Sequence, residues 1–148
     1  MLLETILTED RTRVNVQSAS KKRTLEILAQ IFAEDIDIID ADELFQHFIS
    51  RERLGSTGIG HGIAIPHCRF NTGGQTFAAC ITLEDPIDFD SVDSEPVNVI
   101  FAMLVPEDAE ANHLQTLASI AESLQKPEYV AALRKSKTSS ELFTCAIS

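Results

Sequence analysis

The sequence has few basic residues. Lysine and arginine together number 12, against 23 aspartates and glutamates, for a formal net charge of −11. Nucleic-acid binding depends on neutralising phosphates with lysine and arginine, so this balance argues against a nucleic-acid partner. It fits an acidic protein that docks on basic patches of its partners, although solubility alone also accounts for an acidic surface.

Long apolar runs are also missing. No stretch approaches the ~20 residues needed to cross a bilayer, and the start, Met-Leu-Leu-Glu-Thr, lacks the basic segment that opens an export signal. We therefore expect a soluble, cytoplasmic protein without membrane insertion. The three cysteines, Cys68, Cys80 and Cys145, are an odd set without close spacing, which favours a reducing compartment over a disulfide framework.

Internal repeats, low-complexity tracts and linkers are absent as well. The chain has 148 residues, of which 44% are hydrophobic, so it is long enough to bury a core of its own. We expect a single domain over residues 1–148.

Alternating segments of two kinds predict an α/β fold. Apolar residues at helical spacing, with capping residues before them, predict helices over 21–33 (after Ser20), 41–53 (after Asp40), 112–125, from Pro127, and after Thr138. Apolar runs predict strands over 63–65, 76–83 and 97–105, the last two buried on both faces. The predicted core stripe of the third long helix is Leu114, Leu117, Ala118, Ala121 and Leu124.

Residues 55–67, Gly-Ser-Thr-Gly-Ile-Gly-His-Gly-Ile-Ala-Ile-Pro-His, are the most informative stretch. Glycines tolerate positive φ, so such a loop can turn its N–H groups toward an anion. Pro66 is expected to cut the pairing of the short strand before it and to leave His67 at the strand end, presented rather than buried. A neutral imidazole is a good nucleophile near neutral pH, which indicates phosphoryl or proton chemistry. The competing interpretation is a histidine that only ends a strand and bonds to a carbonyl.

This stretch resembles a known family. A glycine-rich loop followed by Ile-Ala-Ile-Pro-His is the hallmark of the IIA components of the bacterial phosphoenolpyruvate-dependent phosphotransferase system, in the mannitol/fructose class. The run Arg-Glu-Arg-Leu-Gly-Ser-Thr-Gly-Ile-Gly from Arg51 is most similar to the nitrogen-regulatory IIA branch. The similarity extends from the opening Leu-Leu-Glu-Thr-Ile-Leu to the Asn-His-Leu-Gln-Thr-Leu around position 113.

The resemblance implies a compact domain with a small mixed sheet covered by helices on both faces. It implies a phosphocarrier that accepts a phosphoryl group on His67 from an HPr-like carrier protein, with no cofactor. Arg51 matches the family's arginine ahead of the loop, and its guanidinium suits phosphoryl oxygens. His113 matches a second active-site histidine, which we interpret as a hydrogen-bond partner of the phosphoryl group or of His67. The implied targets are potassium-transport systems and sensor kinases.

Several neighbouring residues carry less weight. Arg53 lies two positions after Arg51, so the two side chains point about 200° apart on a helix and cannot both face one site. His47 is interpreted as a solvent-edge residue of its helix. His61 stands where the nitrogen-regulatory branch commonly has asparagine, and Cys68 where glycine is usual, so both are expected to alter loop shape, local pKa or redox sensitivity.

Other kinds of site remain open. A metal could be held by His61, His67, Cys68 and His113, but no Cys-x2–4-Cys or His-x3–5-His pair supports it. A nucleotide site is weaker, because the glycines form neither a Rossmann fingerprint nor a P-loop. Within the family, the alternatives are a regulatory module switched by phosphorylation and a sugar-uptake component that passes the phosphoryl group to a IIB domain.

Overall fold

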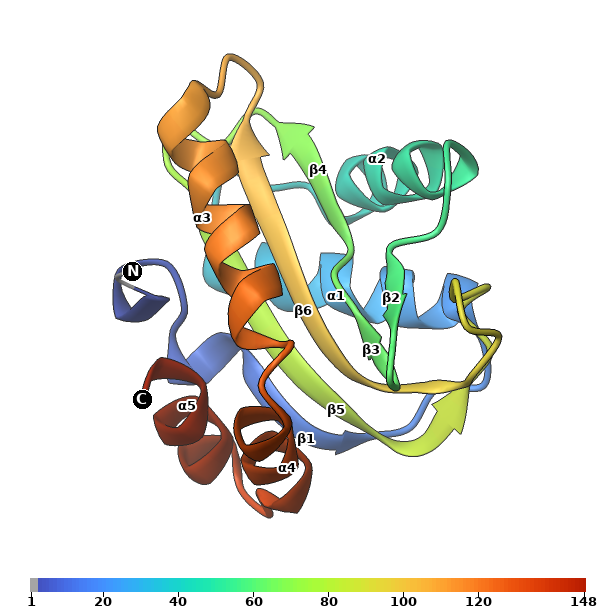
Figure 1. Ribbon diagram of the computed structural model, residues 1–148. Coiled ribbons are helices and arrows are strands. Elements are labelled where there is room, and N and C mark those ends of the chain that lie inside the picture. Colours follow the sequence, from blue (N-terminus) through green and yellow to red (C-terminus); the bar gives the residue numbers. More distant parts are fainter. Residues whose placement is uncertain (1–2) are drawn as a thin grey trace.

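The computed structural model describes residues 3–148, without the side chains of residues 111 and 112. It contains one mixed sheet with helices on both faces, as predicted (Figure 1). The helices are α1 (Lys21–Asp35), α2 (Ala41–Arg53), α3 (Ala111–Ser123), α4 (Pro127–Lys135) and α5 (Ser139–Ile147), with short 3-10 turns η1 (Leu3–Thr5) and η2 (Glu9–Arg11). The strands are β1 (Thr12–Val16), β2 (Gly58–Gly60), β3 (Ile63–Ala64), β4 (His67–Phe70), β5 (Phe77–Ile87) and β6 (Val97–Pro106).

Strand β6 is the centre of the sheet. The order is β1-β5-β6-β3-β2, and β4 pairs with β6 as well. β5 and β6 are antiparallel, whereas β1 runs parallel to β5, and β3 and β4 run parallel to β6. Spacing in the sequence could not have predicted this order, because it depends on which strands pair across the chain.

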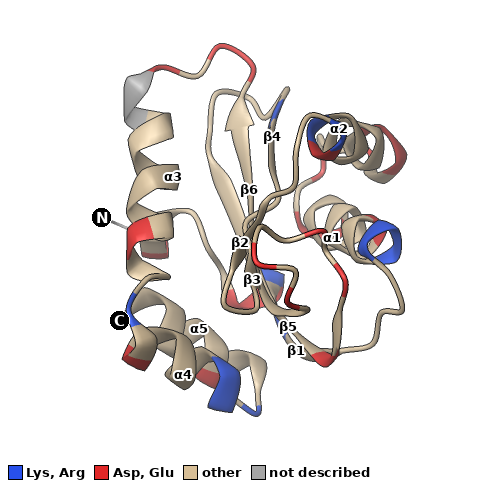
Figure 2. Cartoon of the chain, turned by 45° about the vertical axis from the view of Figure 1, so that its right-hand side comes forward, with Lys and Arg blue, Asp and Glu red and all other residues tan. Residues whose placement is uncertain are grey.

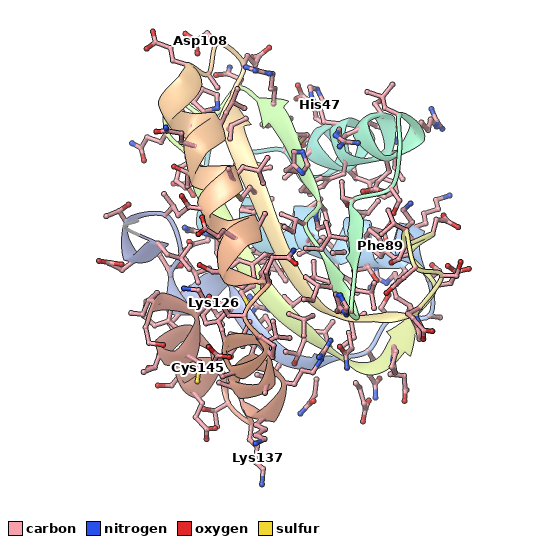
Figure 3. All side chains as sticks on the ribbon, viewed as in Figure 1. His47, Phe89, Asp108, Lys126, Lys137 and Cys145 are labelled. Atoms are coloured by element: carbon pink, nitrogen blue, oxygen red, sulfur yellow. The ribbon has the colours of Figure 1, made fainter. Side chains whose placement is uncertain are left out.

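Two helix layers cover the sheet. α1 and α2 pack on one face, and α3, α4 and α5 cover the other with η1 (Figure 1). Strands β5 and β6 send alternate side chains into both layers, so their residues are buried on either side and the run of apolar residues is continuous. Buried side chains form one cluster on each side of the sheet, and Figure 3 draws the side chains on the ribbon. Burial on both faces was predicted for these two strands and is confirmed.

The helix starts follow their capping residues. The side chains of Ser20, Asp40 and Thr138 accept hydrogen bonds from backbone N–H groups three residues on, at the starts of α1, α2 and α5. Pro127 occupies the first turn of α4. The predicted bounds of α2 agree with the structure, and those of α1 and α3 differ by one or two residues at their ends.

The predicted stripe of α3 needs correction. Leu114 is 47% exposed, Leu117 is half-buried and Ala118 is exposed, whereas Ile120 and Leu124 are buried. Only the C-terminal part of α3 therefore contributes strongly to the core. Its N-terminal leucines face an open groove beside β4. Within the described residues, no helix has the length and apolar character of a membrane span.

Candidate functional site

A groove of about 510 Å³ runs over β4, between α2 and α3. Its floor comes from β4 and the adjoining part of β6, and its walls come from the two helices. The lining residues are His47, Ser50, Arg51, Leu54, His67, Cys68, Arg69, Met103, Val105, Leu114 and Leu117. Leu54 is 85% exposed, so the groove has a partly apolar rim around its charged and imidazole groups.

The backbone around Pro66 places His67 in this groove. Strand pairing with β6 stops after Ala64 and resumes at His67 in the same register, so β3 and β4 are two pieces of one interrupted strand. The Pro66 carbonyl still accepts a 2.9 Å bond from the N–H of Met103. The interruption at proline was predicted, but His67 does not end a strand: it begins β4. Because side chains alternate along a strand, the half-buried His67 ring turns to the groove, whereas Cys68, which borders the groove, is only 7% exposed and packs into the core.

Among the residues that the structure describes, only one nitrogen of the His67 ring, Nδ1, has a hydrogen-bond partner. Nδ1 lies 2.7 Å from the carbonyl oxygen of Ile65. A carbonyl can only accept, so Nδ1 carries the proton and Nε2 keeps the lone pair. Burial lowers the pKa of His67, and the Arg51 charge lowers it further, while the bond to Ile65 and the charge of Glu52 act in the opposite direction. The ring is therefore neutral at neutral pH, with its nucleophilic nitrogen free.

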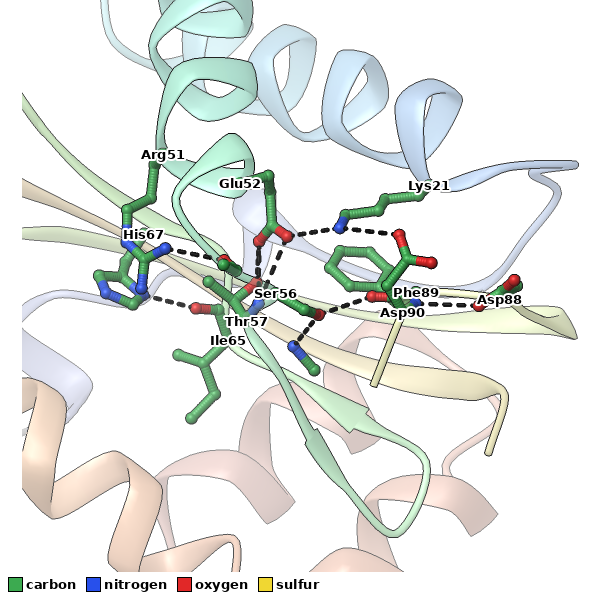
Figure 4. Close-up of polar contacts among 12 residues, drawn as sticks. Lys21, Arg51, Glu52, Ser56, Thr57, Ile65, His67, Asp88, Phe89 and Asp90 are labelled. Carbon is green, nitrogen blue, oxygen red and sulfur yellow. Dashed lines mark hydrogen bonds and ion pairs between the residues drawn. The ribbon is translucent and has the colours of Figure 1, made fainter. Parts of the chain in front are cut away.

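Arg51 lies beside this ring. Its guanidinium is held by a 2.9 Å bond from Nη1 to the carbonyl oxygen of Gly55 (Figure 4). Only part of its donor set is used by that bond, so donors remain for an anion in the groove. Arg53 lies on the other side of α2, in a hollow lined also by Lys21 and Lys22, as the helical spacing predicts. Figure 2 shows these basic residues at the start of α1 and the last turn of α2.

The glycine stretch is a hairpin rather than an open anion loop. Three of its N–H groups are already bound within the protein: that of Thr57 to Glu52, that of Gly58 to Ser56 Oγ and that of His61 to Asp93. These three groups are therefore not free to face an anion, contrary to the expectation for this loop. Glycine is required here for packing and turning, because a Cβ at position 58 would overlap Ser91 Oγ.

His61 and His113 lie outside the groove lining. His61 is exposed at the tip of the hairpin between β2 and β3. The ring of His113 is half-buried and its Nδ1 bonds the hydroxyl of Thr76, just before β5. The next residue, Leu114, faces the groove, and successive side chains on a helix point about 100° apart. In this structure His113 therefore does not bond to His67.

Cys68 has a raised thiol pKa, about 12, because of its burial. Only thiolates are strongly nucleophilic, so the raised pKa works against the redox sensitivity expected for this position. All three cysteines are free thiols. Across residues 3–148 the structure has no group of three or more histidine, cysteine or acidic side chains placed to hold a metal ion.

His47 is the site residue that sequence reasoning missed. Its ring lies on α2 beside β4 (Figure 3), with Nδ1 3.1 Å from the carbonyl oxygen of Arg69 and an edge contact to Phe70 at 4.8 Å between centroids. It is half-buried, which agrees with a position at the solvent edge, but it also lines the groove. The available signal was its spacing: four residues before Arg51, it had to share that helix face.

The fold and the groove first define a class: an α/β protein whose sheet edge holds a neutral histidine beside an arginine. A family model described as "Phosphoenolpyruvate-dependent sugar phosphotransferase system, EIIA 2" matches residues 5–146. The chain therefore belongs to this type 2 EIIA family, as the resemblance of its Ile-Pro-His segment predicts.

Several similar proteins are nitrogen regulatory proteins. The nitrogen regulatory protein of Pseudomonas aeruginosa is 42% identical over 145 residues, which cover 98% of this chain and 94% of that protein. The crystal structure of the nitrogen regulatory protein IIA-Ntr from Neisseria meningitidis matches with a TM-score of 0.91 at 31% identity, over 99% of both chains. The mannitol IIA enzyme of Escherichia coli, solved in complex with phosphorylated IIB, shares the fold with a TM-score of 0.73 at 13% identity, over 92% of this chain and 94% of that one.

Proposed function

We propose that this protein is a phosphocarrier that accepts a phosphoryl group on Nε2 of His67 from an HPr-like carrier protein. The observation that carries the proposal is the ring itself: Nδ1 is bound to the Ile65 carbonyl, and Nε2 is free in a groove beside Arg51. Membership of the type 2 EIIA family supports the same chemistry.

The reaction is a displacement at phosphorus. The Nε2 lone pair forms the new N–P bond while the N–P bond to the carrier's histidine breaks, and that electron pair returns to the carrier's imidazole. The ring of His67 gains positive charge, which the Ile65 carbonyl stabilises through Nδ1–H. Arg51 stabilises the charge on the transferred oxygens. The donor is not a nucleotide, so the step needs no metal or other cofactor.

His113 enters the proposal with one condition. As a hydrogen-bond partner of the phosphoryl group, its ring has to leave the Thr76 hydroxyl and turn toward the groove. Its neighbours Leu114 and Leu117 already line that groove, so a change of rotamer is the smallest movement that could achieve this.

The output we propose is regulatory. Similarity to nitrogen regulatory proteins along nearly the whole chain supports a regulatory end point of the nitrogen-related phosphotransferase system. We propose that it acts in the cytoplasm, with potassium-transport regulators or a sensor kinase as targets. The second candidate is a sugar-uptake component that passes the group to a IIB domain. This second candidate is kept because the chain shares its fold with the mannitol IIA enzyme, which was solved with its phosphorylated IIB partner.

One experiment tests acceptance and output in turn. The protein is incubated with phosphoenolpyruvate, the general phosphotransferase enzyme and the HPr-like carrier, and intact mass is measured. We expect one added phosphoryl group, removed by acid and kept in alkali, and none in His67→Ala. Label that persists in His67→Ala and disappears in His61→Ala or His113→Ala would contradict the assignment. The labelled protein is then offered to IIB domains: rapid onward transfer would favour the sugar-uptake alternative.

A further inference from the structure

Glu52 lies between Arg51 and Arg53 in the last turn of α2, and its carboxylate is nearly buried, with the side chain 6% exposed. A buried carboxylate is costly unless its oxygens are well paired. Glu52 meets that condition: it accepts from the backbone N–H of Thr57 at 3.2 Å and from the Thr57 hydroxyl, and it pairs with Lys21 Nζ at 2.7 Å (Figure 4).

Lys21 is itself held in place. It is the first residue of α1, its Nζ lies 5.1 Å from the ring centroid of Phe89, and it lies 3.4 Å from a carboxylate oxygen of Asp90. The Glu52–Lys21 pair therefore joins the end of α2 to the start of α1 and to the loop after β5. A pair fixed on this many sides gives the carboxylate a defined position.

From Glu52 a continuous set of hydrogen bonds leads to the reactive ring. Thr57, bound by Glu52, accepts from the N–H of Ile65 at 2.9 Å through its carbonyl. The carbonyl of Ile65 in turn accepts from Nδ1 of His67 at 2.7 Å.

The same short segment holds the arginine. The carbonyl of Gly55, two residues before Thr57, accepts the bond from Arg51 Nη1 at 2.9 Å. Both side chains of the proposed site therefore depend on the Gly55–Thr57 segment, and Glu52 binds the far end of that segment (Figure 4).

We propose that Glu52 is a positioning residue for phosphotransfer: by holding Thr57 it fixes the Nδ1–H tautomer of His67 and the place of the Arg51 guanidinium. This inference rests on the proposed function. Glu52 itself touches no reacting atom, so it acts through Thr57. The contrasting interpretation is an ion pair that only stabilises the fold. The two differ in whether the His67 ring changes when the pair is altered.

The test uses two variants and a matched control. Glu52→Gln removes the charge, and Thr57→Val removes the hydroxyl at nearly constant volume. Asp35→Asn is the control, because it also converts a carboxylate to an amide and also breaks a pair with a largely buried base, Arg11, at the other end of α1. Nitrogen NMR of the His67 ring reports the tautomer, phosphotransfer kinetics report the rate, and melting curves report stability.

In the wild type we expect proton on Nδ1 alone. In Glu52→Gln and Thr57→Val we expect a mixture of tautomers and a transfer rate at saturating carrier lower by about ten-fold, with the half-saturating carrier concentration within about two-fold. Thr57→Ser keeps both donors and should behave as wild type. The double variant Glu52→Gln/Thr57→Val should be little worse than either single one, since both changes weaken the same contact between residues 52 and 57.

An unchanged tautomer and rate in Glu52→Gln and Thr57→Val would overturn the proposal, as would equal losses in Asp35→Asn. If Glu52→Gln does not fold, Thr57→Val and Thr57→Ser give the same comparison. If the wild type does not accept a phosphoryl group but Glu52→Gln still shifts the tautomer, the proposed function is wrong. The proposal that Glu52 positions the His67 ring is then still supported.

Discussion

At the scale of single residues, the site depends on a histidine whose charged form is disfavoured. Burial is the main reason that the pKa of His67 lies below the ordinary value of 6.5, and the Arg51 charge adds to it. Attack requires the neutral ring, so a lowered pKa extends the range of pH over which the site is ready.

The pH dependence follows from this sign. We expect the rate of phosphotransfer to fall as the pH decreases, with a midpoint below 6.5 that equals the pKa of His67 measured by NMR titration. Arg51→Gln should move that midpoint upward, since the Arg51 charge lowers the pKa. Below pH 6.5, His67 binds a proton more readily in the unfolded chain than in the folded protein, because its pKa is lower in the folded protein. The free energy of unfolding therefore decreases as the pH falls through this range. A midpoint of the pH–rate profile above 6.5 in the wild type would contradict the burial of His67 and its position beside Arg51.

The two arginines at the end of α2 provide a second residue-scale prediction. Arg51→Lys keeps the charge and loses the planar fork, so phosphotransfer should slow by about ten-fold or more, roughly 1.4 kcal/mol in the barrier. Arg53→Lys, in the separate hollow with Lys22, should leave the rate within about two-fold. Stopped-flow transfer from labelled carrier measures both. Equal losses in the two variants would show that the direction of the side chain is irrelevant.

At the scale of elements, the β2–β3 hairpin is built on a two-residue turn. His61 and Gly62 have φ of 58° and 80°, and Gly60 pairs with Ile63. Two positive φ values in a two-residue hairpin are typical of a type I′ turn, for which Asn-Gly is the preferred pair. This explains physically why asparagine suits position 61, and why histidine there costs little: it is exposed and among the residues that tolerate this conformation.

Stability measurements on this turn test that account. His61→Asn should raise the free energy of unfolding by about 0.5 kcal/mol. Gly62→Ala should lower it by about 1–2 kcal/mol, because a side chain is strained at this φ and its Cβ would overlap the Arg134 guanidinium. Urea unfolding gives both values. Phosphotransfer should be unchanged in the two variants, since neither residue lines the groove; a loss of transfer in His61→Asn would connect the turn to the site.

Elements with local signals were predictable, and those defined by distant partners were not. α1, α2 and α5 begin where a side-chain oxygen caps the chain, and β5 and β6 are long apolar runs. β1 and β4 are short strands that exist through pairing with β5 and β6. β2 is three residues, two of them glycine, and forms only as half of the hairpin.

The site was predictable to a similar degree. The Ile-Pro-His segment predicted His67 and the family resemblance predicted Arg51, and both line the groove, whereas the helical spacing predicted that Arg53 lies elsewhere. The contacts of Thr57 and Glu52 came only with the structure, because they join residues through a fold in the backbone rather than through a helical or strand repeat. The placement of His113 on Thr76 likewise depends on how α3 is set over the sheet.

At the scale of the whole molecule, charge and shape favour one kind of partner for the groove. The chain carries a formal net charge of −11, while the rim of the groove has the exposed Leu54 and Leu114 around Arg51. A carrier with an apolar patch beside its phosphohistidine and basic residues around it would match this surface. Long-range attraction to the acidic molecule would speed the encounter, and the apolar rim would hold the pair.

The central position of β6 also determines when, during synthesis of the chain, the site can form. Arg51 and His67 are both made early in synthesis, but the backbone pairing described for β4 is with β6, and His67 lies opposite Met103. At about 5–20 residues per second, a ribosome needs roughly 2 to 7 s to travel from His67 to Met103. During that interval the nascent chain contains the histidine and the arginine without the sheet that brings them together. Because the last of these strands to be made is the central one, the groove can form only after β6 is available to pair with β4.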